Sequence, residues 1–275
     1  MSAFMDLNVT FSADKSHMQQ LIDMAAHLGY STVAVNYTFE ATAKKKPAIP
    51  SPKPIDELID RLPIVQGRSR PIRVLNRLTL VMSELSHFRP NPSEYAAFDL
   101  LALQPTTEKL FHAACTQLDV DVISVSVTEK LPFFFKRAPV STAVERGLAF
   151  EISYASAIRD AAARRYTVAN AVSLTEACKG KNVLVSSAAA EPLELRGPHD
   201  VVNLCSLMGL SRDGARRALS RTCRSLLLHA ETRKTAGGAV FTRRSRDDSP
   251  DPREAPSPNA PAAKRPKSLR TESPS

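Results

Sequence analysis

The first strand-like segment of the chain ends in Asp6-Leu7-Asn8, at a place where an α/β barrel enzyme could hold a metal ion. A His-x-His pair there would bind zinc or iron, because paired imidazoles are good ligands for both metals. An aspartate and an asparagine do not replace that pair. The six histidines form neither a His-x-His nor a His-x-x-x-His spacing: His17, His27, His87, His112, His199 and His229. We therefore predict no metal site.

Other catalytic patterns are also incomplete. Gly209 and Gly214 have the spacing of a phosphate-binding loop, but Ala215-Arg216 follows where a lysine and a hydroxyl residue are required. Ser186-Ser187 follows an apolar run without the Gly-x-Ser-x-Gly sequence of a hydrolase nucleophile. No pair of acidic residues has a spacing that assigns general acid and base roles. We predict no catalytic residue and no cofactor.

Basic side chains gather instead in turns and at element ends. Arginine forks bind phosphate with two parallel hydrogen bonds, and aromatic faces stack on unpaired bases, as the Phe133–Phe135 run beside two cations could do. Each cluster could equally be a solvated face or a local ion pair, and Arg70 could anchor the strand at Pro71. We predict that the following residues contact RNA or a protein partner: Arg68, Arg70, Arg73, Lys136, Arg137, Arg196, Arg233 and Lys234.

Short apolar runs alternate with amphipathic helical runs along the body of the chain, which is typical of a parallel sheet covered by helices. The predicted strands cover residues 5–9, 32–36, 73–81, 98–103, 120–127, 149–154 and 183–185. The predicted helices cover residues 16–28, 55–62, 107–118, 142–146, 158–178, 200–208 and 212–229.

Such a sheet can close into a barrel or stay open and doubly wound. A body of about 240 residues matches the ~250 residues typical of a barrel. No glycine-rich turn follows the first strand, so the nucleotide-binding form of the open sheet loses its main support. We predict an α/β fold, a TIM-like (β/α) barrel over residues 1–240.

Charge and cysteine content narrow the class of protein. The 275 residues include 37 Lys+Arg and 28 Asp+Glu, a formal net charge of +9, with a pI near 9.6. This excess suits a polyanion such as nucleic acid, although an ordinary basic soluble protein also fits. The four cysteines are scattered, as in a reducing compartment. No apolar run approaches the ~20 residues that a membrane helix needs, so we expect no membrane contact.

Residues 241–275 differ in composition from the rest. They hold seven of the 20 prolines and almost no large apolar residues, so we predict a disordered basic tail. Within it, Lys264, Arg265 and Lys267 form a short basic cluster typical of nuclear import signals. Three serines precede proline and are predicted phosphorylation sites: Ser249, Ser257 and Ser273.

Four segments carry a resemblance to a known family. They are residues 62–72 (LPIVQGRSRPI), 127–133 (VTEKLPF), 146–151 (RGLAFE) and 186–198 (SSAAAEPLELRGP). In this order they resemble the thirty-kilodalton protein subunit of ribonuclease P, and the similarity extends over about residues 3–235. The tail is similar to the variable, basic end of eukaryotic members.

The resemblance implies a barrel related to the metal-dependent phosphoesterase (PHP-like) barrels but without their metal ligands. It implies an accessory subunit of a nuclear and nucleolar particle in which RNA is the catalyst and removes the 5′ leader of precursor tRNA. The eukaryotic subunit is shared with RNase MRP, which processes ribosomal RNA. The implied partners are the catalytic RNA of ribonuclease P and RNase MRP, precursor tRNA, a small α/β protein subunit and other subunits, with up to two copies of this chain per particle.

One alternative stays open at this point. The chain could be an autonomous metal-dependent phosphoesterase-like hydrolase whose ligands come together only in space. The two hypotheses differ in a simple observation, because the isolated chain of an accessory subunit should cleave neither precursor tRNA nor simple phosphodiesters when divalent metal is added.

Overall fold

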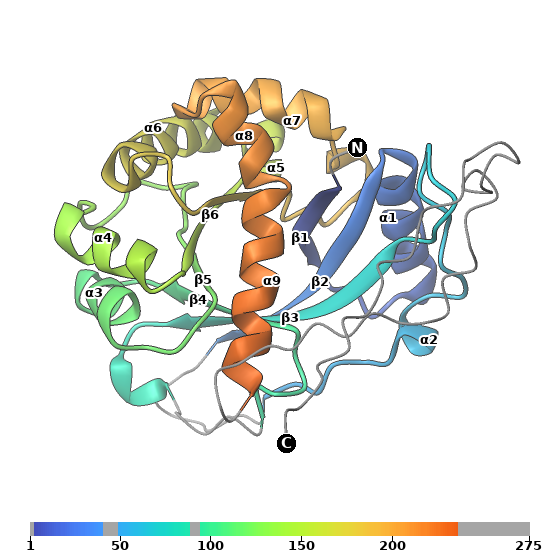
Figure 1. Ribbon diagram of the computed structural model, residues 1–275, viewed down its shortest axis with the longest axis horizontal. Coiled ribbons are helices and arrows are strands. Elements are labelled where there is room, and N and C mark those ends of the chain that lie inside the picture. The colour runs from blue at the N-terminus through green and yellow to red at the C-terminus, as the bar shows by residue number, and fades with distance from the viewer. Residues whose placement is uncertain (1–2, 41–48, 89–93, 236–275) are drawn as a thin grey trace, which may run out of the picture. The chain divides into compact units, whose positions relative to one another are not determined.

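The computed structural model describes residues 3–40, 49–88 and 94–235. Seven parallel strands follow one another around the sheet in sequence order, which gives a nearly closed barrel (Figure 1). This confirms the predicted TIM-like (β/α) architecture. The strands are β1 (Phe4–Thr10), β2 (Tyr30–Glu40), β3 (Arg73–Met82), β4 (Leu100–Pro105), β5 (Val122–Ser124), β6 (Ala149–Ser153) and β7 (Val183–Ser186).

Helices connect the strands and surround the sheet (Figure 1). They are α1 (Lys15–His27), α2 (Ile55–Leu58), α3 (Glu108–Thr116), α4 (Arg137–Glu145), α5 (Ala155–Arg159), α6 (Ala161–Cys178), α7 (Pro198–Leu204), α8 (Arg212–Ala218) and α9 (Arg221–Lys234). Three short 3₁₀ segments cover Leu85–His87, Pro192–Glu194 and Cys205–Met208. No helix in the described part of the chain is long and apolar enough to cross a bilayer.

The ends of the helices follow local chemistry. The Asp14 carboxylate caps α1 by accepting a hydrogen bond from the Ser16 N–H at 2.9 Å, and the chain leaves this helix through Gly29 at φ +92°. The Asp160 side chain caps α6 in the same way. Because Asp160 also ends α5, the predicted continuous helix over residues 158–178 is broken into two at this residue.

Other predicted elements differ from the structure as well. The helix expected over residues 55–62 ends at Leu58, and the helix expected over residues 142–146 covers Arg137–Glu145. The expected strand over residues 120–127 is paired only over Val122–Ser124, and the expected helix over residues 212–229 is interrupted after Ala218. The break at Leu219 and Ser220 separates α8 from α9. It lets the Leu219 carbonyl accept a hydrogen bond from the Met5 N–H of β1 at 2.9 Å. Apolar periodicity runs through this break, so the sequence pattern does not reveal it.

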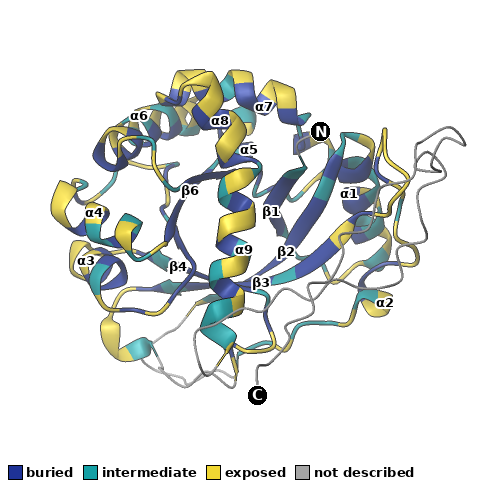
Figure 2. Cartoon of the chain, in the orientation of Figure 1, coloured by how far each residue is buried: buried dark blue, intermediate teal, exposed yellow. Residues whose placement is uncertain are grey.

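The two faces of the sheet have different partners. Residues such as Leu78 and Leu80 of β3 pack outward into the large core shared with the surrounding helices, while Leu75 and Arg77 of the same strand face inward. Every strand is largely buried, whereas the helices alternate buried and exposed positions (Figure 2). This alternation is the pattern expected for a parallel sheet covered on its outer face.

A layer of apolar side chains fills one end of the barrel interior. It is contributed by the first halves of the strands and is closed by α9, whose Cys223, Leu226 and Ala230 pack against it. The strand residues of this layer are Met5, Leu7, Ala34, Leu75, Leu100, Ala102, Val122, Ala149 and Leu184. In Figure 1, α9 crosses in front of the sheet. Farther along the same strands, the interior positions become polar.

Candidate functional site

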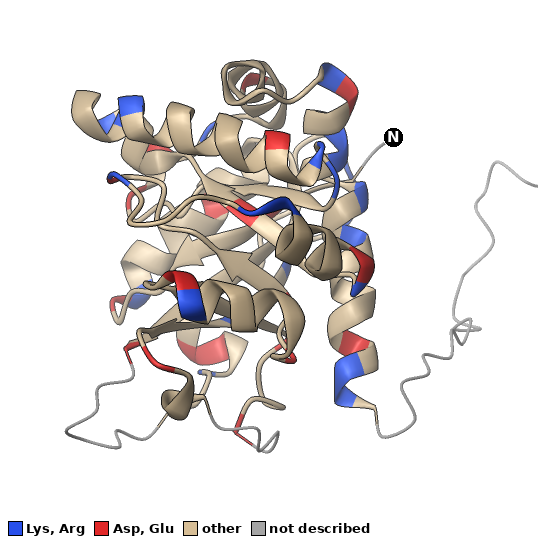
Figure 3. Cartoon of the chain, turned by 90° about the vertical axis from the view of Figure 1, so that its left-hand side faces the viewer, with Lys and Arg blue, Asp and Glu red and all other residues tan. Residues whose placement is uncertain are grey.

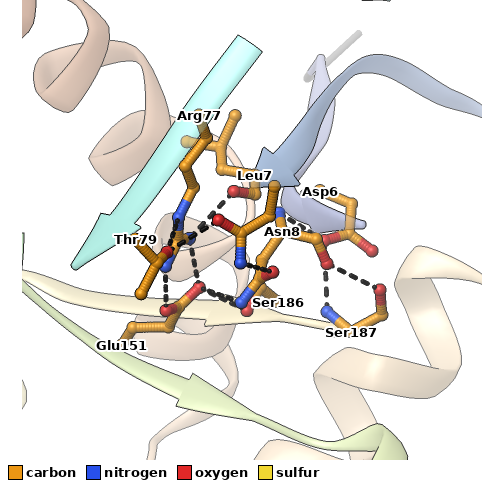
Figure 4. Close-up of polar contacts among 9 residues, drawn as sticks. Asp6, Leu7, Asn8, Arg77, Thr79, Glu151, Ser186 and Ser187 are labelled. Carbon is orange, nitrogen blue, oxygen red and sulfur yellow. Dashed lines mark hydrogen bonds and ion pairs between the residues drawn. The ribbon is translucent and has the colours of Figure 1, made fainter. Parts of the chain in front are cut away.

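The polar layer of the barrel interior is centred on a buried ion pair. The guanidinium of Arg77 on β3 holds both oxygens of Glu151 on β6, with Nη1–Oε1 at 2.6 Å and Nη2–Oε2 at 2.5 Å (Figure 4). Both side chains are fully buried. Arg77 Nη1 also donates to the Leu7 carbonyl, and its Nε donates to the Thr79 hydroxyl. This two-pronged contact uses the geometry in which arginine binds carboxylate best.

Neutral polar side chains donate further hydrogen bonds to Glu151. Its Oε1 accepts hydrogen bonds from Asn8 Nδ2 at 3.1 Å and from the Ser186 hydroxyl at 2.7 Å. Asn8 Oδ1 in turn accepts from Asn36 Nδ2 at 2.9 Å. Burial alone raises the pKa of Glu151, but the nearby Arg77 charge and these hydrogen bonds outweigh it and hold the pKa below its usual value. The network joins five of the seven strands across the interior.

Both carboxylate oxygens of Glu151 are therefore engaged by side chains of the protein itself. Its oxygens already accept four hydrogen bonds from Arg77, Asn8 and Ser186. Within the described residues, no group of three histidine, cysteine, aspartate or glutamate side chains is placed to hold a metal ion. In this arrangement the guanidinium supplies the positive charge at the centre of the barrel, and both oxygens of Glu151 are already hydrogen-bonded.

Asp6, singled out from the sequence at the end of the first strand, performs a structural task. Its Oδ1 accepts hydrogen bonds from the Ser187 N–H at 3.1 Å and from the Asn8 N–H at 3.2 Å (Figure 4). Strands β1 and β7 are not paired in a ladder. The segment that follows β7 contacts β1 through a parallel bridge between Val9 and Ala189 with flanking backbone hydrogen bonds. We call this junction between β1 and the end of β7 the seam of the barrel. Here the Asp6 carboxylate accepts the hydrogen bond that a backbone carbonyl would accept in a regular ladder.

The environment of Asp6 changes its acidity. Burial raises its pKa to about 6, although hydrogen bonds from Ser187 and Asn8 oppose this rise. Its second oxygen, Oδ2, is buried and has no hydrogen-bond partner. A fully buried carboxylate with one oxygen unsatisfied is costly in its charged form, so ionised Asp6 destabilises the folded protein at neutral pH.

Three predicted contact residues lie together near the start of β3. Arg68 and Arg70 belong to an exposed turn that is closed by the Val65 N–H donating to the Arg70 carbonyl at 3.2 Å. Arg73 is exposed as the first residue of β3. Arg68 also borders a cavity of about 410 Å³ together with Arg216. The structure therefore places this cluster on the surface, as the sequence predicted.

The aromatic–cation cluster before α4 is only partly exposed. Phe133 is buried against Phe111, with ring centroids 5.2 Å apart, whereas Phe134 is 91% exposed. Lys136 Nζ lies 2.7 Å from Glu108 Oε1 in an exposed ion pair. Arg137 begins α4 and is exposed. Of the three predicted stacking rings, Phe134 alone is fully presented to solvent.

Arg196 supports its own loop. Its Nη1 donates to the Leu193 and Leu195 carbonyls at 2.6 and 2.8 Å. Its backbone N–H donates to the Tyr154 hydroxyl, and its carbonyl accepts from the Tyr30 hydroxyl. These contacts fix the segment before α7, and they leave the second guanidinium nitrogen, Nη2, with no hydrogen bond to another described residue.

The structure corrects the expectation that Arg233 reaches outward from the end of the last helix. Its guanidinium is 6% exposed and pairs with Asp121, with Nη2–Oδ2 at 3.0 Å. His229 Nδ1 lies 3.0 Å from the other oxygen of Asp121. Burial tends to raise the pKa of Asp121, but His229 and Arg233 lower it overall. Lys234 adds a contact to Asp99 at 3.7 Å, so this end of α9 is fixed to the barrel.

The predicted residues of the tail lie outside the described residues. They are Lys264, Arg265, Lys267, Ser249, Ser257 and Ser273. Sequence reasoning also missed the central ion pair. The signal for it was a charge of opposite sign within each of two apolar strands, Arg77 in RVLNRLTLV and Glu151 in AFEIS.

Fold and site together define a class of protein: a TIM-like barrel with a buried ion pair between Arg77 and Glu151 in its interior and a cluster of exposed arginines, Arg68, Arg70 and Arg73, on its surface. The model of the RNase P subunit p30 family matches residues 3–235. The chain belongs to this family of ribonuclease P protein subunits.

Individual relatives agree with the family match. The chain is 49% identical over 270 residues to ribonuclease P protein subunit p30 of Mus musculus, covering 97% of this chain and 99% of the relative. It is 30% identical to ribonuclease P/MRP protein subunit RPP1 of Saccharomyces cerevisiae, covering 77% and 74%. The fold is similar to a chain of archaeal ribonuclease P solved with mature tRNA, with a TM-score of 0.60, 13% identity and coverage of 88% and 100%.

Proposed function

We propose that the chain is a non-catalytic subunit of the ribonuclease P particle that removes the 5′ leader of precursor tRNA. The observation that carries this proposal is the family match across the whole described barrel, residues 3–235. The interior supports it, because Glu151 is fully engaged by Arg77 and its neighbours and has no free oxygen to activate water. We therefore assign the binding of RNA and of partner proteins to the outer surface of the barrel.

The exposed basic residues are proposed to contact the catalytic RNA or precursor tRNA. Arg68, Arg70 and Arg73 support this best, because all three are exposed on one short stretch of a rigid scaffold. Arg137 and Lys136 are also exposed, although Lys136 must release Glu108 to bind phosphate. Contacts of this kind position RNA without reading its sequence.

Other surfaces suit protein subunits of the particle. Large apolar side chains at protein surfaces are typical anchors of interfaces, and Phe134 and Leu193 are 91% and 81% exposed. We propose that these residues face partner subunits, among them a small α/β subunit and, in some particles, a second copy of this chain. The S. cerevisiae relative is named as a subunit of both ribonuclease P and MRP, so we extend the proposal to the rRNA-processing RNase MRP particle.

Purification of the particle tests this proposal. The tagged full-length chain, isolated from cells at physiological salt, should carry with it the RNAs of ribonuclease P and RNase MRP and the activity that matures precursor tRNA. An unrelated tagged protein of the same net charge is the control for nonspecific capture of RNA. Equal enrichment of bulk RNA by both proteins would contradict the proposal.

We further propose that the chain works in the nucleus and nucleolus, and that Lys264, Arg265 and Lys267 contribute to its import. Replacing all three with alanine should reduce the nuclear fraction of the isolated chain relative to a variant with three alanines at Ser249, Ser257 and Ser273. An unchanged distribution would remove the import role of the tail. Exclusion of the wild-type chain from the nucleus would contradict the location itself.

A further inference from the structure

A basic cavity lies at the corner where α8, α9 and the start of β7 meet. It has a volume of about 380 Å³, and three of its lining residues are Lys181, Arg217 and Arg221. The remaining lining residues are glycines, apolar residues and neutral polar residues, among them Thr222 and Ser225. None of the lining residues is acidic, so the cavity concentrates positive charge without a compensating carboxylate.

The three cations arise from different elements of the fold. Lys181 follows a tight turn in which Lys179 and Gly180 have positive φ angles of 54° and 66°. Arg217 is in the last turn of α8, and Arg221 is the first residue of α9. Figure 3, in which α9 runs down the right-hand edge, shows basic positions grouped around the start of that helix. Three separate segments therefore bring charge to one hollow.

Within the described residues, none of these cations has an internal partner. The ion pairs and side-chain hydrogen bonds of the fold engage neither Lys181 nor Arg217 nor Arg221. By contrast, Arg77, Arg146 and Arg233 each have several contacts within the protein. Cations gathered around one cavity repel each other, and an anion in the cavity would relieve that repulsion.

The neutral lining provides hydrogen-bond donors as well. The side-chain hydroxyls of Thr222 and Ser225 line the cavity and form no hydrogen bond with another described residue, and the first turn of α9 has no side-chain cap. The Ser220 hydroxyl, which could have capped this helix, donates instead to the Arg216 carbonyl at 2.5 Å. Together, arginine forks, one ammonium group and hydroxyl donors match the oxygens of a phosphate group.

We propose that this cavity binds a phosphodiester group of the particle's RNA. The proposal rests on the proposed function, which supplies the RNA, and it adds a site to the predicted residues. A protein partner fits the cavity less well: its apolar lining residues, Ala149, Val183 and Leu226, are already buried, so no exposed anchor remains for a protein interface. The surrounding segment supports this choice, because residues 211–230 contain five arginines and one acidic residue, Asp213.

Salt titration of RNA binding by the full-length chain tests the proposal. The variant Arg217→Gln/Arg221→Gln removes two charges from the cavity but keeps helix-forming side chains. The matched control, Lys109→Gln/Arg165→Gln, removes two charges from exposed positions outside the cavity. We expect only the cavity variant to reduce the slope of log K against log salt, by roughly 0.7–0.9, the value for one phosphate that is no longer neutralised. If the variant and the wild type bind RNA equally at 1 M salt, the variant should then bind about 5-fold more weakly than the wild type at 0.15 M salt.

Three results would overturn the site. Equal slopes for the cavity variant, the control variant and the wild type would exclude phosphate contact there. Loss of a protein subunit from the cavity variant, with an unchanged RNA slope, would assign the cavity to an acidic protein segment. Inorganic phosphate could also raise the Tm of the wild type but not that of the cavity variant, while both proteins keep the same salt slope for RNA binding. That result would assign the cavity to small anions and not to RNA. If the wild type bound no RNA, the proposed function would fail as well.

Discussion

Replacing Arg77 with methionine tests the role of the barrel's central ion pair. The substitution keeps most of the side-chain volume but leaves the Glu151 carboxylate buried without its cation. Breaking a fully buried pair in this way costs about 3–5 kcal/mol of unfolding free energy. For a domain of this size, each kcal/mol lowers Tm by about 2–4 °C, so we expect a decrease of about 6–20 °C.

Urea unfolding of the full-length chain, followed by circular dichroism, gives the free energy directly. The control variant Arg165→Met changes an exposed arginine and should stay within about 0.5 kcal/mol of the wild type. The double variant Arg77→Met/Glu151→Gln removes the orphaned charge but keeps an acceptor for Asn8 and Ser186. It should therefore be more stable than Arg77→Met alone.

The dependence on pH has a defined direction. The pKa of Glu151 is lowered in the folded protein, so its ionisation stabilises the fold fully above the usual value of 4.5 and loses this effect as pH falls through the lower folded pKa. In Arg77→Met, burial without the cation raises the pKa of Glu151, so its ionisation opposes folding of the variant. The stability gap between the wild type and Arg77→Met should therefore widen as pH rises above 4.5 and narrow as pH falls into the acid range. An Arg77→Met variant as stable as Arg165→Met at pH 7 would refute this reasoning.

Two further predictions concern the seam and the outer surface. Asp6→Asn should stabilise the protein by up to about 3 kcal/mol at pH 8, because ionising a carboxyl whose folded pKa is about 6 rather than 3.8 opposes folding. The gain should vanish below about pH 4, and denaturant unfolding across pH measures it; a gain that is independent of pH would contradict the role of ionisation. Replacing Arg68, Arg70 and Arg73 with alanine should lower the salt slope of RNA binding by roughly 0.7–0.9 for each phosphate that the variant no longer neutralises. An unchanged slope in a variant that is folded by circular dichroism would exclude direct phosphate binding by this cluster.

Much of the fold could be predicted from the sequence because apolar periodicity determines it. The alternation of strand-like and helical runs predicted a barrel, and the seven strands form in the expected order. The break between α8 and α9 could not be predicted in this way, because the apolar spacing continues across Leu219 and Ser220. That break depends on a contact between distant segments, the hydrogen bond from Met5 to Leu219.

The candidate site was harder to predict, because pairing between distant residues determines what a charged side chain does. Arg233 and Arg68 both occupy ends of elements in the sequence, yet Arg233 is buried against Asp121 while Arg68 is exposed. Nothing local distinguishes them, since Asp121 is 112 residues away from its partner. Asp6 attracted attention as a position for metal chemistry, and the structure shows it holding the barrel seam.

We propose that the chain supports catalysis by RNA and does not itself cleave RNA. A reconstituted ribonuclease P particle, assembled with and without the chain, should process precursor tRNA more slowly without it. The isolated full-length chain, supplied with magnesium, manganese or zinc, should leave both precursor tRNA and a simple phosphodiester intact. Metal-dependent turnover by the isolated chain, abolished in a Glu151→Gln variant that is still folded, would contradict this claim.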